Sequence, residues 1–280
     1  MRPNTRYVHG TAPTEQSRLT RLNRIINDAS LREMRVPRGA RMIDFGSGLG
    51  QMSRAMAAAA GPRSRVLGIE WSPEQLEEAR RQARGTRERS RVEFRSGSVQ
   101  DPPLTDDEWG RFDLAHARFI LEHVPDPLTV VKNMVRAVKP GGRIVLADDD
   151  HEIFRVWPEP PGYSEVWRAY MRTYDRLGND PFVGRRLVDL LYRAGAQPKR
   201  NSLVFFGACS GHPDFDPMVV ILAEMLEGAR ATIVPAGLLD GAMYDEAMRA
   251  LRAWGRRPDA ALWFAMSWAE GVRPRRGRKA

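Results

Sequence analysis

The sequence has 280 residues, of which 42% are hydrophobic and 28% charged, as is typical of a globular protein with a sizeable core. The formal net charge is +9, but the basic residues are spread along the chain, which does not favour a nucleic-acid-binding surface. The sequence contains no apolar run of the ~20 residues that a membrane span needs, and its N-terminal stretch has no signal-peptide core. We therefore expect a cytoplasmic protein that binds neither nucleic acid nor a membrane.

Strand and helix patterns alternate between residues 41 and 150, which indicates an α/β fold with a parallel sheet. The expected strands cover residues 41–45, 65–70, 92–95, 112–116 and 143–147. Ser72 is expected to cap the helix that follows the second strand, with Pro73 at its first position. The motif Lys139-Pro140-Gly141-Gly142 is expected to form a turn before the fifth strand.

The second half of the chain is expected to add helices and two further strands, at residues 203–206 and 262–268. Ser164 is expected to cap a helix that carries the aromatic stripe Trp167, Tyr170 and Tyr174, which at this spacing is more typical of a core than of a ligand site. Cys209 is the single cysteine, which excludes an intramolecular disulfide, and its apolar neighbours favour a buried thiol.

These patterns predict a Rossmann-like, seven-stranded, mostly parallel sheet with helices on both faces. An N-terminal helical cover and helical insertions after strands five and six are expected in addition. The expected segments are the helical cover (1–35), a cofactor-binding core (36–152), a helical substrate cap (153–200), the strands and helices that complete the sheet (201–272) and a disordered basic tail (273–280).

A glycine-rich turn follows the first strand, in the segment Asp44-Phe45-Gly46-Ser47-Gly48-Leu49-Gly50. Glycine permits positive φ angles and lets a ligand approach the backbone closely, and the helix that follows offers free N–H groups to an anion. Glu70 ends the second strand, where a carboxylate can accept hydrogen bonds from both hydroxyls of a ribose. Asp44 can face a cation.

The glycine spacing distinguishes between two nucleotide cofactors. A dinucleotide fingerprint reads G-x-G-x-x-G, whereas this turn reads G-x-G-x-G and has Gln51 at the position of the last glycine. S-adenosylmethionine (SAM) has no pyrophosphate to cradle, and its ammonium group suits an acidic residue beside the turn. The pattern therefore favours SAM over NAD.

At this point the sequence resembles the class I SAM-dependent methyltransferases of the small-molecule type. The resemblance covers residues 41–150 well and the rest more loosely. It is carried by the turn at 42–50 and by four further segments. These are Gly68-Ile69-Glu70-Trp71-Ser72, Phe94-Arg95-Ser96-Gly97-Ser98-Val99, the stretch 112–127 after the fourth strand, and Lys139-Pro140-Gly141-Gly142.

The resemblance implies a set of SAM-binding residues. Gly46, Ser47 and Gly48 would approach the methionine part and Glu70 the ribose, while Trp71 would stack on adenine. The remaining members of the implied set, in the turn, beside the adenine and near the methyl donor, are Asp44, Gly50, Gly97, Ser98, Val99, Ala117 and Arg118. Ser98 stands where many relatives have Asp, so its uncharged hydroxyl would accept more weakly from the adenine amino group.

The N-terminal stretch also resembles the leader of small-molecule methyltransferases, in which a helix covers the bound cofactor. Tyr7 and Arg18 are the candidates for this cover. Tyr7 packing the helix onto the sheet, without contact to the cofactor, is an equal alternative.

Methyl transfer needs the donor and the acceptor in line, and a base where the acceptor is still protonated. His151 and Asp149 follow the fifth strand, at the edge where ligands bind in open α/β sheets, and are the candidates for contact with the acceptor. A solvated acidic loop is the alternative. His123 is expected to be structural, while His116 can be packed or face the site. No metal is expected, because the three adjacent residues Asp148 to Asp150 point in different directions.

The leading hypothesis is methyl transfer to a small organic acceptor, at O, N or C, by a monomer or homodimer. Three alternatives stay open. They are methylation of RNA or protein, which the net charge favours; SAM binding without catalysis, as a partner subunit; and an NAD-linked oxidoreductase.

Overall fold

The structure is a computed structural model and describes residues 13–275, except for the side chains of residues 13–19, 21, 22 and 24. The first part of the chain contains α1 (Pro13–Met34), β1 (Arg41–Phe45), α2 (Gln51–Ala60), β2 (Arg65–Glu70), α3 (Pro73–Arg84), β3 (Val92–Ser96), β4 (Phe112–Arg118), a short 3-10 helix (Leu121–His123), α4 (Pro127–Ala137) and β5 (Val138–Asp148). The second part contains β6 (Arg155–Trp157), α5 (Tyr163–Asp175), a second 3-10 helix (Val183–Arg186), α6 (Leu187–Arg193), β7 (Gln197–Cys209), α7 (Phe215–Ile233), α8 (Gly241–Trp254) and β8 (Ala261–Val272).

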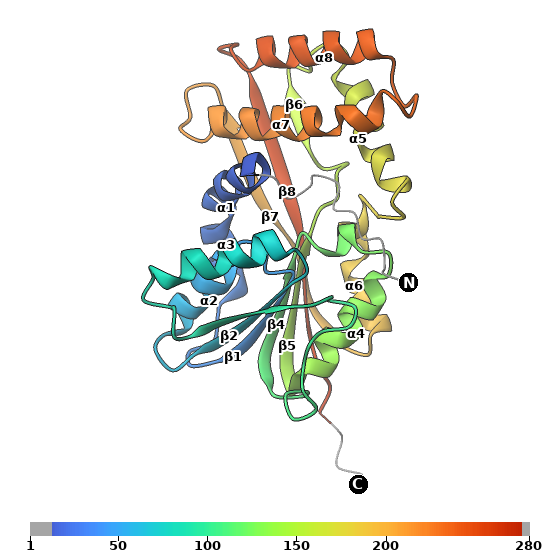
Figure 1. Cartoon of the computed structure of the whole chain (residues 1–280). Helices are drawn as coiled ribbons and strands as arrows, with labels where there is room; N and C mark the ends of the chain where they lie inside the picture. The colour runs from blue at the N-terminus through green and yellow to red at the C-terminus, as the bar shows by residue number, and fades with distance from the viewer. Residues whose placement is uncertain (1–12, 276–280) are drawn as a thin grey trace.

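The strands form one mixed sheet in the order β3-β2-β1-β4-β5-β8-β6, with β7 paired to β8 (Figure 1). Strands β1 to β5 run parallel to one another, whereas β8 is antiparallel to β5, β6 and β7. The order reverses between β1 and β4. In open α/β sheets a crevice forms at such a reversal, beyond the carboxyl ends of the strands. The topology therefore places a ligand site there.

Helices cover both faces of the sheet because alternate residues of each strand point to opposite faces. Ile43 and Leu146 belong to the core that α4 and α6 cover, whereas Met42 and Val145 belong to the core beneath α1 and α2. The predicted Rossmann-like arrangement with helices on both faces is thus confirmed.

The predicted number of strands is wrong, since the sheet has eight strands rather than seven. The additional strand is β6, whose three residues pair with the beginning of β8, beyond the end of β5. A strand of three residues has no periodicity that a sequence pattern can reveal. The fifth strand also begins earlier than predicted, at Val138, so that the expected turn at 139–142 lies within β5.

A third hydrophobic core lies above the parallel sheet and is formed by α5, α7 and α8 with the ends of β6, β7 and β8 (Figure 1). Gly162 is the N-cap of α5, with a φ of 75°, so the predicted cap at Ser164 is wrong. By contrast, Ser72 caps α3 as predicted, because its hydroxyl accepts the N–H of Gln75 at 3.2 Å.

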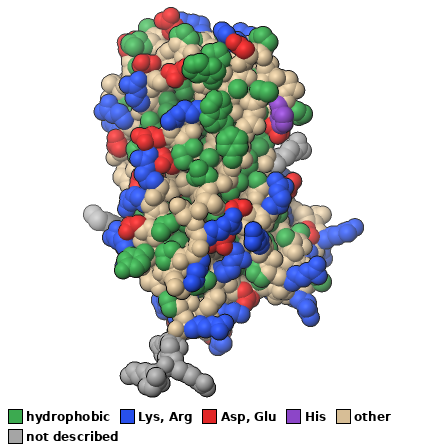
Figure 2. Space-filling model, turned by 180° about the vertical axis from the view of Figure 1, so that it is seen from behind, with side chains coloured by type: hydrophobic (Ala, Val, Ile, Leu, Met, Phe, Trp, Pro, Cys, Tyr) green, Lys and Arg blue, Asp and Glu red, His purple; other side chains and the backbone are tan. Residues whose placement is uncertain are grey.

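Strand β7 alternates between inward and outward side chains. Val204, Phe206 and Ala208 are buried, whereas Leu203 and Phe205 are exposed. Cys209 continues the exposed set, so the expectation of a buried thiol is wrong. Figure 2 shows apolar side chains gathered on the back of the upper half of the molecule. None of the helices in residues 13–275 combines the length and apolarity that crossing a membrane requires.

Candidate functional site

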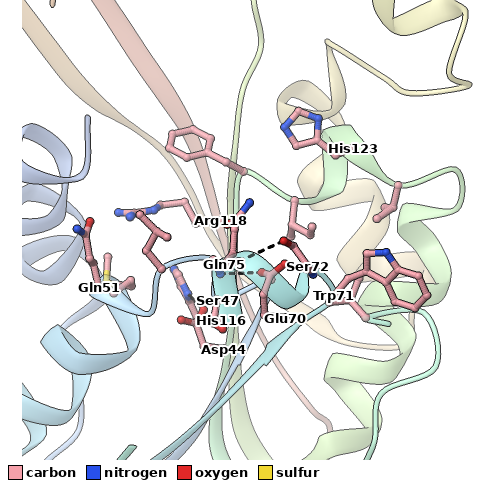
Figure 3. A pocket seen from close by; sticks show the side chains of 18 of the residues that line it. Asp44, Ser47, Gln51, Glu70, Trp71, Ser72, Gln75, His116, Arg118 and His123 are labelled. Carbon is pink, nitrogen blue, oxygen red and sulfur yellow. Dashed lines mark hydrogen bonds and ion pairs between the residues drawn. The ribbon is translucent and has the colours of Figure 1, made fainter. Parts of the chain in front are cut away.

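A cleft of about 510 Å³ lies where the strand order reverses, at the carboxyl ends of β1, β2 and β4. Its wall includes Asp44 from β1, Glu70 from β2 and His116 and Arg118 from β4 (Figure 3). The segments after β1, β2, β3 and β4 also contribute to the wall, together with Asn23 of α1. A volume of this size suits a cofactor-sized ligand.

The turn between β1 and α2 needs its glycines. Gly46, Gly48 and Gly50 have φ angles of 74°, 52° and 67°, a region that other residues enter at a cost of about 1–2 kcal/mol. A Cβ atom on Gly46 would lie 2.8 Å from Ile120 Cγ1, which is closer than atoms can approach. The turn can therefore lie flat against the cleft, and Gly46, Ser47 and Gly48 form part of its wall.

Glu70 joins this turn to the turn after β2. Its two carboxylate oxygens accept the N–H groups of Gly48 and Ser72, each at 2.8 Å (Figure 3). Burial raises the pKa of Glu70, and these backbone hydrogen bonds oppose the rise. Each carboxylate oxygen has two lone pairs, so Glu70 keeps acceptor capacity for hydroxyl groups of a ligand.

Asp44 lies beneath the glycine turn and orients a histidine. Its carboxylate accepts the Ser53 hydroxyl at 2.5 Å and lies 2.8 Å from Nδ1 of His116. The other ring nitrogen of His116, Nε2, is buried and has no partner among the described residues, and the same holds for the hydroxyl of Ser47. Both side chains line the cleft. Buried polar atoms are rarely left unpaired, so these two atoms indicate where a polar ligand is expected.

Arg118 connects α1 to the cleft by hydrogen bonds. Its guanidinium donates to Ser30 at 3.0 Å and to Asn23 and Asn27 at 2.5 and 2.8 Å, all three on α1. Desolvation lowers the pKa of Arg118 to about 10, while the charge of Asp44 opposes this shift. The predicted helical cover therefore lies beside the cleft, held by a charged residue at the end of β4.

The expected adenine region lies at the opposite end of the cleft from Gln51 (Figure 3). Trp71 is half exposed there, with 50% of its surface accessible, so one face of the indole is available for stacking. The Ser98 hydroxyl accepts the N–H of Gln100 at 3.2 Å, which leaves one lone pair and its hydrogen for a ligand. Val99 also lines the cleft.

Several residues of the predicted set lie elsewhere. Gly50, Gly97 and Ala117 do not line the cleft; Gly50 caps α2, and Ala117 belongs to the core. Tyr7 and the side chain of Arg18 lie outside the described residues, as do residues 276–280 of the predicted tail.

A second, smaller cavity of about 110 Å³ adjoins the cleft, and Phe119 and His123 line both. Phe119 follows β4 with a φ of 53°, an uncommon conformation for a bulky side chain. Such strain is maintained where the surrounding structure requires it, often at functional sites. The wall is mostly apolar and aromatic and comes from α1, α5, α7, β7 and β8. The aromatic stripe Trp167, Tyr170 and Tyr174 is therefore both buried core and cavity wall.

His151 and Asp149 line this second cavity together with Glu122. His151 Nε2 lies 3.1 Å from Glu122 Oε2 and 3.2 Å from the Tyr174 hydroxyl. Burial lowers the pKa of His151, whereas burial and the charge of Glu122 raise the pKa of Asp149 well above its usual value. Both shifts favour the uncharged forms of these side chains.

Glu122 was missed at the level of sequence. His123, which was expected to be structural, lines both cavities. Glu122 is 29 residues from His151, and its only local signal is the motif after the fourth strand. Glu122, Asp149 and His151 place their potential ligand atoms within 4.8 Å of one another, which is a geometry that can hold a metal ion. No metal was expected from the three adjacent aspartates, whereas this cluster combines Asp149 with the distant Glu122 and with His151.

Comparison with known proteins agrees with this geometry. Residues 43–146 match the family model described as a methyltransferase domain. A demethylmenaquinone methyltransferase from Bacillus licheniformis is 31% identical over 173 residues, which are 59% of this chain and 69% of that protein. A 37.1 kDa protein of transposon TN4556 from Streptomyces fradiae is 34% identical over 159 residues, but the alignment spans 56% of this chain and only 43% of that protein.

Among solved structures, a geranyl diphosphate C-methyltransferase from Streptomyces coelicolor, in complex with Mg²⁺, geranyl diphosphate and S-adenosyl-L-homocysteine, aligns with a TM-score of 0.55 and 17% identity. The alignment covers 94% of this chain and 85% of that one, and it shows a shared fold. The fold and the glycine turn define a protein of the Rossmann-like α/β class. With the family match, the chain belongs to the class I SAM-dependent methyltransferases.

Proposed function

We propose that this protein transfers a methyl group from SAM to a small organic acceptor. The cleft at the strand reversal binds SAM, and the aromatic cavity binds the acceptor. The observation that supports this arrangement most strongly is that the two cavities meet at Phe119 and His123, one at the carboxyl edge of the parallel strands and the other with a mostly apolar wall.

Different residues of the cleft bind different parts of the cofactor. Glu70 accepts hydrogen bonds from the ribose, Trp71 stacks on adenine beside Ser98 and Val99, and the turn at 46–48 approaches the methionine part. Asp44 lies close enough to favour the ammonium group. This arrangement would place the methyl group toward Arg118 and the boundary of the two cavities.

The protein's own contribution to the transfer is positioning, exclusion of water and removal of a proton. Holding donor and acceptor in line about 3 Å apart supplies much of the rate enhancement. A neutral His151 can accept a proton from the acceptor, and Glu122 stabilises the imidazolium that results, as a carboxylate does in other histidine pairs. Asp149 contacts the acceptor from the same side.

The small volume of the second cavity supports a small acceptor rather than RNA or protein. A cavity of about 110 Å³ covered by α1, α5 and α7 holds a small chemical group. An RNA-binding methyltransferase would also lose affinity steeply between low and moderate salt.

Calorimetric titration tests the proposal directly. S-adenosylhomocysteine, the product form of SAM, is expected to bind at micromolar concentration, and NADH is not. Binding of NADH in preference to S-adenosylhomocysteine would reject the cofactor and with it the reaction. Turnover of SAM with a panel of small acceptors then separates an enzyme from a SAM-binding partner subunit.

A further inference from the structure

Strand β7 is an edge strand of the sheet. It pairs with β8 over almost its whole length, and no other strand within residues 13–275 pairs with it. In an antiparallel pair, alternate residues turn their N–H and C=O groups away from the neighbouring strand. Within residues 203–208, these outward groups have no hydrogen-bond partner in the part of the chain that the structure describes. The edge is therefore open for pairing.

The two halves of this edge differ in their protection against pairing. The first half carries Pro198, Lys199 and Arg200 and contains a β-bulge. Proline, charged residues and bulges are common means by which an edge strand avoids pairing with another chain. The second half, residues 203–209, reads Leu-Val-Phe-Phe-Gly-Ala-Cys and has neither a charge nor a proline. An uncharged edge of this length is suited to receive one further strand.

Exposed apolar side chains lie along the same segment. Phe205 and Leu203 leave 66% and 56% of their surfaces exposed. The partly exposed Trp263 of β8 pairs with Gly207 and so points to the same face. A Cβ atom on Gly207 would lie 3.1 Å from Phe205 Cε1, which shows that the phenyl ring extends along the strand. The helices α5, α7 and α8 pack on the other face. A contiguous exposed apolar patch marks an interaction surface.

From the open edge and the apolar face together, we propose that residues 203–209 of β7 pair antiparallel with the same segment of a second copy of this chain. This inference goes beyond the proposed function and does not depend on it. A second copy fits because its segment has the same length and the same lack of charge, and because a segment that pairs antiparallel with itself forms a closed two-fold dimer. The register that pairs the whole segment is centred on Phe206 and sets Leu203 opposite Cys209 of the second copy.

A second copy suits this edge better than a lipid surface does. Lipid offers no row of N–H and C=O groups at the spacing of a strand, so the backbone groups of residues 203–208 would stay unpaired. The net charge of +9 opposes association of two copies and favours adsorption to anionic lipid. Because the segment itself is uncharged, this repulsion comes from residues outside it, and salt screens it. Added salt should therefore strengthen the pairing of two copies and weaken adsorption to anionic lipid.

Sedimentation equilibrium of the full chain tests this proposal. Interfaces of limited area are typically weak, so the concentration series runs from about 1 to about 200 µM. The wild-type chain is expected to form dimers in this range, and to associate more tightly at about 300 mM than at about 50 mM salt. Phe205→Lys adds a charge in the middle of the segment and should weaken association at least about tenfold. The matched control is Met243→Lys, at an exposed apolar position of α8, which should associate as the wild type does.

The single cysteine reports the register of the pair. Cys209 is exposed and can carry a spin label. In the proposed register the two labelled positions lie about 20 Å apart along the strands. Pulsed electron paramagnetic resonance should therefore give one distance of about 20–30 Å, label arms included, which is lost in Phe205→Lys. A chain that stays monomeric, a dimer that Phe205→Lys leaves intact, or a distance beyond about 40 Å would overturn the proposal. Adsorption to phosphatidylserine vesicles without dimer formation would do the same.

Discussion

The carboxylate of Glu70 accepts the backbone N–H of Gly48 at 2.8 Å and thereby ties the end of β2 to the glycine turn after β1. The same carboxylate also holds the N–H of Ser72. One side chain thus sets the distance between the two turns that form the floor of the cleft. Glu70 also lines the cleft, and we assign the space beside it to the ribose.

Replacing Glu70 by Gln should therefore weaken cofactor binding. A glutamine side chain has one acceptor oxygen, so it cannot accept both backbone N–H groups and a ribose as well. We expect the affinity for S-adenosylhomocysteine to fall roughly 10- to 100-fold, measured by calorimetry. Glu77→Gln, at an exposed position of α3, should bind as the wild type does. Unchanged affinity in Glu70→Gln would remove Glu70 from the cofactor site.

Two glycine substitutions should differ clearly in their effect on stability. A Cβ on Gly50 would lie 2.3 Å from Phe94 Cζ, at a φ of 67°, whereas a Cβ on Gly85 meets nothing within 4 Å and φ there is −85°. Gly50→Ala should reduce the free energy of unfolding by about 2–4 kcal/mol. Gly85→Ala should leave it unchanged or raise it by up to about 1 kcal/mol. Urea denaturation measures both, and equal losses would contradict the packing at Gly50.

Arg118 should govern how firmly α1 is held. Arg118→Met removes the guanidinium that donates to Ser30, Asn23 and Asn27. Hydrogen exchange in residues 20–34 should then become about tenfold faster or more, because hydrogen bonds to charged groups contribute about 1.5–3 kcal/mol. Arg193→Met, on the exposed surface of α6, is the control. Unaltered exchange in the Arg118 variant would show that α1 is held by its apolar face alone.

The pH dependence of stability should reveal the raised pKa of Asp149. Its folded-state pKa is raised, so the folded protein binds more protons than the unfolded chain above the usual value of 3.8. Unfolding free energy is therefore lost as the pH rises from about 4 toward the folded pKa. Asp149→Asn should consequently gain more stability, relative to wild type, at pH 8 than at pH 5.

Asp259 should show the opposite pH dependence of stability in the same urea titrations, because its pKa is lowered. Arg257 lowers the pKa of Asp259, so the contribution of Asp259 is present above its unfolded value of about 3.8 and is lost on acidification. Asp259→Asn should thus lose stability at neutral pH rather than gain it. A pH-independent effect of Asp149→Asn would show that this carboxylate is solvated in the folded protein.

The parts of the fold predicted from sequence are those with local signals. The strands before β5 follow from short apolar runs that alternate with helical patterns along the chain, and the turn at 46–50 and the cap at Ser72 follow from residue types that their backbone conformations require. The parts that were missed depend on pairing between strands that are far apart in the sequence. Strand β6 exists because three residues meet the start of β8, and Cys209 is exposed because β7 extends far enough for its alternation to reach it.

The candidate site likewise has one part that could be predicted from the sequence and one part that could not. Glu70 and Trp71 could be predicted because the motifs of the first half of the chain are contiguous. The second cavity could not be predicted, since its wall combines α1, α5, α7 and β8. The spacing of residues within one element does not indicate which distant elements it contacts. His151 was selected by its position after the fifth strand, but its partner Glu122 becomes evident only when the two are seen 3.1 Å apart.

The most direct test of the central claim is a crystal structure of the full chain with S-adenosylhomocysteine. The proposed site predicts ribose hydroxyls within hydrogen-bonding distance of Glu70, adenine against Trp71, and sulfur directed toward the boundary at Phe119. A nucleoside bound away from Glu70, or a cleft that excludes it at saturating concentration, would contradict the assignment of this cleft as the methyl-donor site.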